Sequence, residues 1–135
     1  MPIRILIITL MIAGMIFPVN WLAANNPEFK TVFVQFSEFS HVIAHLLLYG
    51  SFALLAVFLF RMPFTLRTGL ILMAAVILIG YGQEILQLQV KGRVFSSPEI
   101  FDLQVDVAGA YLGWRLSYYL RWWGDQARRV LNFSQ

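Results

Sequence analysis

Ionisable side chains stand at helical spacing inside the apolar parts of this sequence. His41 and His45 are four residues apart, Asp102 and Asp106 are four residues apart, and Glu84 lies in a third apolar stretch. An ionisable group within a membrane-spanning helix costs about 2.5–3.5 kcal/mol on insertion scales, so such groups are usually functional. Imidazoles and carboxylates are the side chains that transfer protons in acid–base catalysis. The same groups also hydrogen-bond to polar ligands.

The polar residues of three separate stretches are expected to meet at one depth. Residues spaced by three or four share one face of a helix, which groups His45 with Tyr49 and Glu84 with Gln87. The expected polar pocket consists of His45, Tyr49, Glu84, Gln87, Arg93, Asp102 and Asp106. His41 is expected at the interface. Each member alone has an ordinary structural reading, such as a helix-dipole carboxylate or a solvated loop arginine.

The sequence gives little basis for assigning a reaction. It contains no cysteine, which excludes a thiolate nucleophile and cysteine-ligated zinc. It has no H-E-x-x-H pair, no G-x-S-x-G and no glycine-rich phosphate loop. We therefore expect no metal and no cofactor, and we leave the catalytic residues unassigned.

Composition indicates which elements must position these residues. Of 135 residues, 59% are apolar and 13% are charged, against about 45–50% and about 25% in soluble domains. A soluble chain this short could not bury so much apolar surface. The net charge of +3 comes from basic residues in short gaps between apolar runs, which is a membrane pattern and not a nucleic-acid-binding one.

Four segments are apolar and long enough to cross a bilayer, which takes about 20 residues. They cover about 5–22, 40–60, 68–90 and 98–123, and they predict an all-α, four-helix membrane bundle forming one domain over 1–135. Ser96 and Glu99 form a capping box at the start of the fourth segment. The first segment has an alternative interpretation as a cleaved signal peptide.

Basic residues predict the orientation of the bundle, because cytoplasmic loops carry the excess of Lys and Arg. One side holds Arg4, Arg61, Arg67, Arg121, Arg128 and Arg129, and the other holds Lys30, Lys91 and Arg93. This distribution predicts both termini inside, a location in the cytoplasmic membrane, and a polar pocket that faces the exterior. Arg115 is near enough to the inner end to snorkel.

The fourth segment has a further stripe below its carboxylates. Gly109 and Gly113 follow Asp106 on the same face. Paired small residues at this spacing let two helix backbones approach closely in membranes. We therefore expect these two glycines to serve helix packing.

The ordered set of motifs resembles the VanZ-like family of small membrane proteins, over about residues 40–114. The motifs are His45-Leu-Leu-Leu-Tyr49, then Gly82-Gln-Glu84-Ile-Leu-Gln87, then Arg93, and finally Asp102-x-x-x-Asp106-x-x-Gly109-x-x-x-Gly113. The family has Asp-Lys ahead of the histidine, where this chain has His41-Val42. It has asparagine where this chain has Asp106.

The resemblance implies a multi-pass membrane protein of the cell envelope. Founding members of the family are associated with reduced sensitivity to the glycopeptide teicoplanin. We expect a pocket that engages an envelope lipid, a lipid-linked glycan or a glycopeptide, with membrane lipids as neighbours and no nucleic-acid partner. Two alternatives remain: a membrane hydrolase or transferase acting on a lipid-linked substrate, and an accessory structural subunit. The oligomeric state is not predicted.

Overall fold

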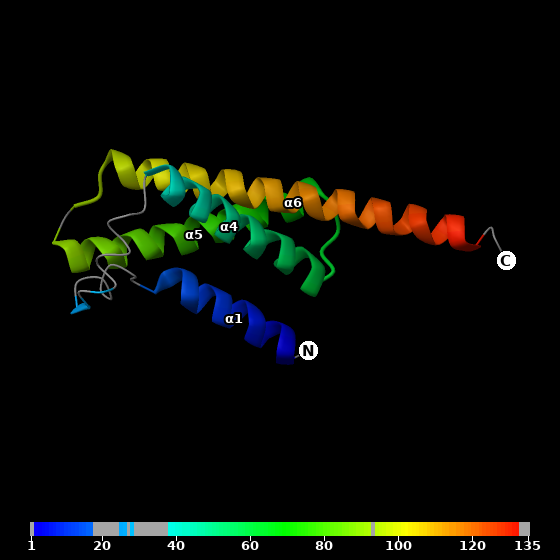
Figure 1. The fold of residues 1–135 in the computed structure, drawn as a ribbon, viewed down its shortest axis with the longest axis horizontal. Helices are drawn as coiled ribbons and strands as arrows, with labels where there is room; N and C mark the ends of the chain where they lie inside the picture. Colours follow the sequence, from blue (N-terminus) through cyan, green and yellow to red (C-terminus); the bar gives the residue numbers. More distant parts are fainter. Residues whose placement is uncertain (1, 18–24, 27, 29–37, 93, 133–135) are drawn as a thin grey trace.

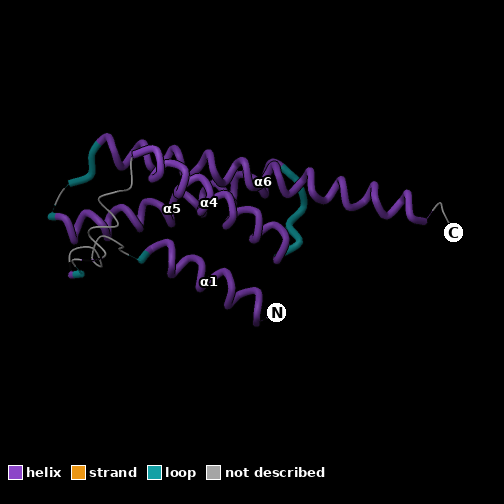
Figure 2. Tube along the Cα trace, viewed as in Figure 1, coloured by secondary structure: helices purple, strands orange, loops and turns teal. Residues whose placement is uncertain are grey.

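The computed structural model describes residues 2–17, 25, 26, 28, 38–92 and 94–132. It gives bounds for four helices: α1 (Pro2–Ile16), α4 (Glu38–Leu59), α5 (Leu66–Lys91) and α6 (Ser97–Asn132). The regular structure among the described residues is entirely helical, as the composition predicts. The four helices lie side by side and successive helices run in opposite directions (Figures 1 and 2).

Two of these helices are long and apolar enough to cross a membrane, over Phe39–Leu59 and Leu66–Val90. The apolar part of α1 is shorter, Ile3–Ile16, and the rest of the predicted first segment, 18–22, lies outside the described residues. Helix α6 continues nine residues beyond the predicted end at 123. The residues that follow Trp123 are too polar for a membrane span, yet most of them are good helix formers, and a single glycine does not end a helix.

The helix ends are fixed by local hydrogen bonds. The backbone N–H of Met62 donates to the carbonyl of Val57 at 3.0 Å and that of Arg61 donates to Phe58 at 3.3 Å, which is the Schellman pattern at the end of α4. Arg61 takes the left-handed conformation there, with φ of 51°. At the start of α6, Glu99 accepts from the backbone N–H of Ser96 at 2.8 Å and from its hydroxyl at 2.6 Å, and the first of these bonds is one half of the expected capping box.

The closest packing in the bundle is between α4 and α6, which run parallel. A Cβ atom added to Gly109 would lie 2.6 Å from the carbonyl oxygen of Leu46, and one added to Gly113 would overlap the carbonyl of Gly50. The neighbours are backbone atoms, which cannot move aside as a flexible side chain can. The two glycines therefore lie where α6 packs closely against the backbone of α4.

Candidate polar site between three helices

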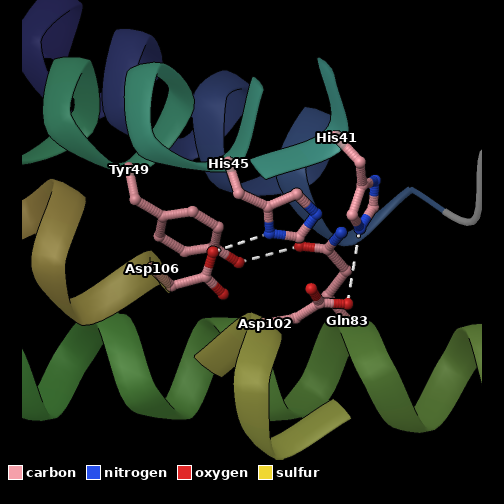
Figure 3. Close-up of polar contacts among 6 residues, drawn as sticks. All are labelled: His41, His45, Tyr49, Gln83, Asp102 and Asp106. Carbon is pink, nitrogen blue, oxygen red and sulfur yellow. Dashed lines mark hydrogen bonds and ion pairs between the residues drawn. The ribbon is translucent and has the colours of Figure 1, made fainter. Parts of the chain in front are cut away.

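Two histidine–aspartate pairs join α4 to α6 in the same register. The Nδ1 atom of His45 lies 2.7 Å from Oδ1 of Asp106, and Nε2 of His41 lies 3.3 Å from Oδ2 of Asp102. Both pairs span 61 residues of sequence. Because the members are four residues apart on each helix, the pairs form two successive rungs of a ladder between parallel helices (Figure 3).

Burial increases steeply from the first rung to the second. The side chain of His41 is 51% exposed and that of Asp102 is 19% exposed, whereas His45 and Asp106 expose 7% and 1%. The two imidazole rings are in contact, with centroids 4.3 Å apart. The outer rung therefore covers the inner one, and His41, expected only at the interface, belongs to the cluster.

Helix α5 contributes to the cluster through Gln83. The hydroxyl of Tyr49, whose side chain is fully buried, donates to Oε1 of Gln83 at 2.8 Å. Figure 3 shows Tyr49, His45 and His41 projecting from α4 towards α6 and α5. Sequence analysis missed Gln83, although it is part of the Gly82–Gln87 motif, because the motif alone does not show which of two glutamines meets the tyrosine.

The close approach of α5 depends on Gly80. A Cβ atom at this position would lie 2.7 Å from Oδ2 of Asp106 and 3.3 Å from the hydroxyl of Tyr49. Oδ2 is buried and has no hydrogen-bond partner among the described residues. The carboxylate of Asp106 thus uses one oxygen to hold His45 and turns the other towards α5.

The other predicted site residues divide into two groups. Glu84 and Gln87 are buried, with 5% and 8% exposed, on the face of α5 that also carries Gly80 and Gln83. Arg93 lies outside the described residues. The structure therefore joins His45, Tyr49, Asp102 and Asp106 through hydrogen bonds with one another or with His41 and Gln83, and it places Glu84 and Gln87 on the adjoining buried face.

The chemistry available to this cluster is that of hydrogen bonding and proton transfer. Among the described residues, no three His, Asp or Glu side chains are placed to hold a metal ion together. Two apolar hollows lie in the described surface, and neither includes a residue of the two rungs. One is lined by Ile3, Ile5, Leu6 and Thr9, and the other by Ile77, Ile100, Leu103, Gln104 and Val107. The outer rung is the more exposed of the two, so a molecule approaching from outside the bundle would meet His41 and Asp102 first.

The opposite end of the bundle is rich in arginine and aromatic residues. The guanidinium of Arg121 donates to the carbonyl of Met62 at 2.6 Å and to that of Val57 at 2.7 Å, so it caps the end of α4, whose last carbonyls have no partner within the helix. Arg115 lies 5.7 Å from the ring centroids of Phe64 and Tyr119. Arg121, predicted only as a topology signal, thus also joins two helices.

Comparison with known proteins adds no relative to this description. No protein-family model, no curated protein and no solved structure matches the chain.

Proposed function

We propose that this chain is a VanZ-like integral membrane protein whose four helices all cross the cytoplasmic membrane, with both termini inside. The alternating helix directions support this arrangement (Figure 1), as does the apolar character of α4 and α5. Helix α6 is less apolar by composition, but Asp106 and Ser117 are almost completely buried at 1% each and would not face lipid. Polar residues inside membrane segments face the bundle interior in this way.

The topology can be tested with single cysteines, because the natural chain has none. Ser97→Cys at the start of α6 and Gln126→Cys near its end are both on exposed positions. In intact cells, a membrane-impermeant maleimide is expected to label the first and to label the second only after the membrane is opened. Labelling of both positions from outside, or of neither, would contradict the four-span arrangement.

We further propose that the polar cluster binds the polar head of an envelope amphiphile, such as a lipid-linked glycan or a lipid-bearing glycopeptide, from the exterior. The observation that carries this proposal is the graded ladder of His–Asp rungs at one end of three helices, with its outer rung exposed. Carboxylates accept hydrogen bonds from hydroxyl and amide groups, and imidazole either donates or accepts. The exposed outer rung of His41 and Asp102 therefore suits the hydroxyl-rich and amide-rich head of such a molecule.

The proposal is tested in a teicoplanin-sensitive host at matched membrane abundance. The wild type is expected to lower teicoplanin sensitivity, and Asp102→Asn, which keeps the size of the side chain but removes its charge, is expected to reduce that protection. Asp125→Asn is the matched control, because Asp125 is exposed on the same helix at the opposite end. Equal protection by all three chains would make the cluster architectural. Protection by none of them would show that the glycopeptide association does not extend to this chain.

A hydrolase acting on a lipid-linked substrate is the second candidate, and the outer rung favours it. Asp102 holds Nε2 of His41 while the ring remains half exposed, and a carboxylate that orients an imidazole in this way is typical of a general base. Water would give its proton to Nδ1 of His41 as its oxygen bonds to the substrate, and the leaving group would then take that proton. Release of product from a lipid-linked substrate by the purified wild type, abolished in His41→Asn, would distinguish turnover from binding.

A further inference from the structure

The charges of this chain are separated along the bundle axis. Seven arginines lie at the end where α4 finishes and α5 begins, or beyond it on α6: Arg4, Arg61, Arg67, Arg115, Arg121, Arg128 and Arg129. Asp125 is the one acidic residue on that side, because the other six acidic residues precede α4, begin it, or lie in the second half of α5 and the first turns of α6. The sequence therefore places a strong positive field at one end.

Helix α6 extends past the bundle at this arginine-rich end (Figure 1). Its partner α4 ends at Leu59, and the register set by the backbone contacts of Gly109 with Leu46 and of Gly113 with Gly50 places that end beside residue 122 of α6. Residues 123–132 of α6 thus continue beyond α4 by about 15 Å, at 1.5 Å per residue. Within these protruding residues, the side chains that the structure describes, from Trp123 to Arg129, are all exposed.

The exposed section of α6 has two different faces. Tyr119, Trp123 and Ala127 follow one another at intervals of four residues, and so form an apolar row. Arg121, Asp125 and Arg128 occupy the opposite side of the helix, which is the side that Arg121 turns towards α4. Trp123 is 69% exposed and Tyr119 is 49% exposed, so the apolar row points away from the bundle.

We propose that the section of α6 from Tyr118 to Arg129 binds an anionic membrane surface. This inference rests on the proposed membrane location but not on the ligand of the polar cluster. Charge complementarity identifies the partner, because arginines near an anionic bilayer are attracted to its phosphate groups, and tyrosine and tryptophan favour the headgroup region. Because α6 is one continuous helix that is proposed to cross the bilayer, this section meets the surface where the helix leaves it, with its aromatic side chains at headgroup level.

A fluorescent label on a single cysteine tests this surface contact in the full chain reconstituted into vesicles. Ala127→Cys carries an environment-sensitive dye on the apolar row, and Asp125→Cys carries it on the opposite side. In vesicles that mix phosphatidylcholine with phosphatidylglycerol, the dye at 127 is expected to move to an apolar environment, whereas the dye at 125 stays in water. In pure phosphatidylcholine, or at high salt, the change at 127 is expected to shrink, because salt screens surface charge.

Substituting single arginines makes the test of surface binding quantitative. A basic residue near an anionic surface contributes about 1 kcal/mol, which is about fivefold in an equilibrium constant. Arg128→Gln and Arg129→Gln are each expected to lower the ratio of bound to free label by about fivefold, and the double variant by more. Lys91→Gln, at the last residue of α5 and the other end of the bundle, is the control and is expected to leave that ratio unchanged.

Three outcomes would overturn the proposal. An equal dye response in neutral and anionic vesicles would show that the apolar row enters the bilayer whatever its charge. A response that rises with the number of chains per vesicle would assign it to a second copy. A dye at 127 that stays in water throughout would leave the section free of the surface. If the chain fails to enter vesicles and is extracted by alkaline carbonate, the proposed membrane location itself fails, and that result is separate from the other three.

Discussion

The substitution Gly109→Ala is expected to push α4 and α6 apart and to weaken the polar cluster with them. The added methyl group would lie 2.6 Å from the carbonyl oxygen of Leu46 and 2.9 Å from its Cα atom. Ordinary contact begins at 3.4 Å, so the backbones must separate by about 0.8 Å. If the helices move apart as rigid bodies, the 2.7 Å distance between His45 and Asp106 lengthens to as much as about 3.5 Å, beyond good hydrogen-bond geometry.

Gly124→Ala is the matched control for this substitution. It lies on the same helix, and an added Cβ atom there meets nothing within 4 Å. Both variants gain the same intrinsic helix stability, about 1 kcal/mol for replacing glycine by alanine. Only Gly109→Ala adds atoms to a closely packed contact, which typically costs about 1–3 kcal/mol. The free energy of unfolding is therefore expected to be about 1–3 kcal/mol lower for Gly109→Ala than for Gly124→Ala.

The comparison can be made on purified protein in detergent micelles, by following helical circular dichroism during denaturation. If Gly109→Ala unfolds at the same denaturant concentration as Gly124→Ala, the close backbone contact between α4 and α6 is wrong. The packing argument for the ladder would then fail with it.

Three more substitutions test the other contacts by the same unfolding measurement. Asp106→Leu is expected to be about 1–3 kcal/mol less stable than Asp106→Asn. The amide oxygen of asparagine still accepts from the imidazole of His45, whereas leucine leaves a buried donor without a partner. Equal stability of the two variants would show that the bond is not made. Arg121→Leu is expected to cost about 2–4 kcal/mol, because it removes the hydrogen bonds to the carbonyl of Val57 in α4 and to that of Met62 just after α4. Arg121→Lys should retain part of that stability, and unfolding of Arg121→Leu at the wild-type denaturant concentration would show that these bonds contribute nothing. Arg61→Gly is expected to gain about 1 kcal/mol, since glycine adopts positive φ without steric cost; a loss of stability would mean that the arginine side chain contributes more than its backbone costs.

Much of the helical framework follows from the order of apolar and polar residues. The second and third predicted segments, 40–60 and 68–90, agree with α4 and α5 to within two residues at each end. Their ends are marked by local chemistry that acts within a few residues, as with Thr65, whose hydroxyl accepts from the backbone N–H of Thr68. Helix α6 extends beyond the predicted end at 123 because membrane length limits only the apolar part of a helix, whereas helix formation continues as long as propensity allows.

The pairing of side chains was less accessible from sequence. Helical spacing groups His41 with His45 and Asp102 with Asp106, but which stripes meet depends on which helices lie side by side. That choice follows from close backbone contacts. On α4 these contacts are made by Gly50 and by the carbonyl of Leu46, and neither residue has a polar side chain that would mark the contact in the sequence. The sequence likewise does not identify Gln83, because its hydrogen bond with Tyr49 depends on the close approach of α5 that Gly80 permits.

Two independent features select the same register for α4 and α6. In the observed register, both histidines face an aspartate. If the helices slid by one turn in one direction, His45 would face Asp102 and His41 would face Pro98. Sliding by one turn in the other direction would place His41 opposite Asp106 and His45 opposite an alanine. Either shift therefore loses one rung.

Backbone packing penalises the same two shifts. One shift would bring Val105 opposite Leu46 in place of Gly109, and the other would bring Ser117 opposite Gly50 in place of Gly113. Each replaces a glycine by a side chain where even a Cβ atom does not fit. A buried polar pair is weak evidence for stability, and fixing the register is its best-attested use. We infer that the buried pair of His45 and Asp106 sets the height at which His41 and Asp102 meet, so a ligand at the outer end would contact a rung that the inner one has positioned.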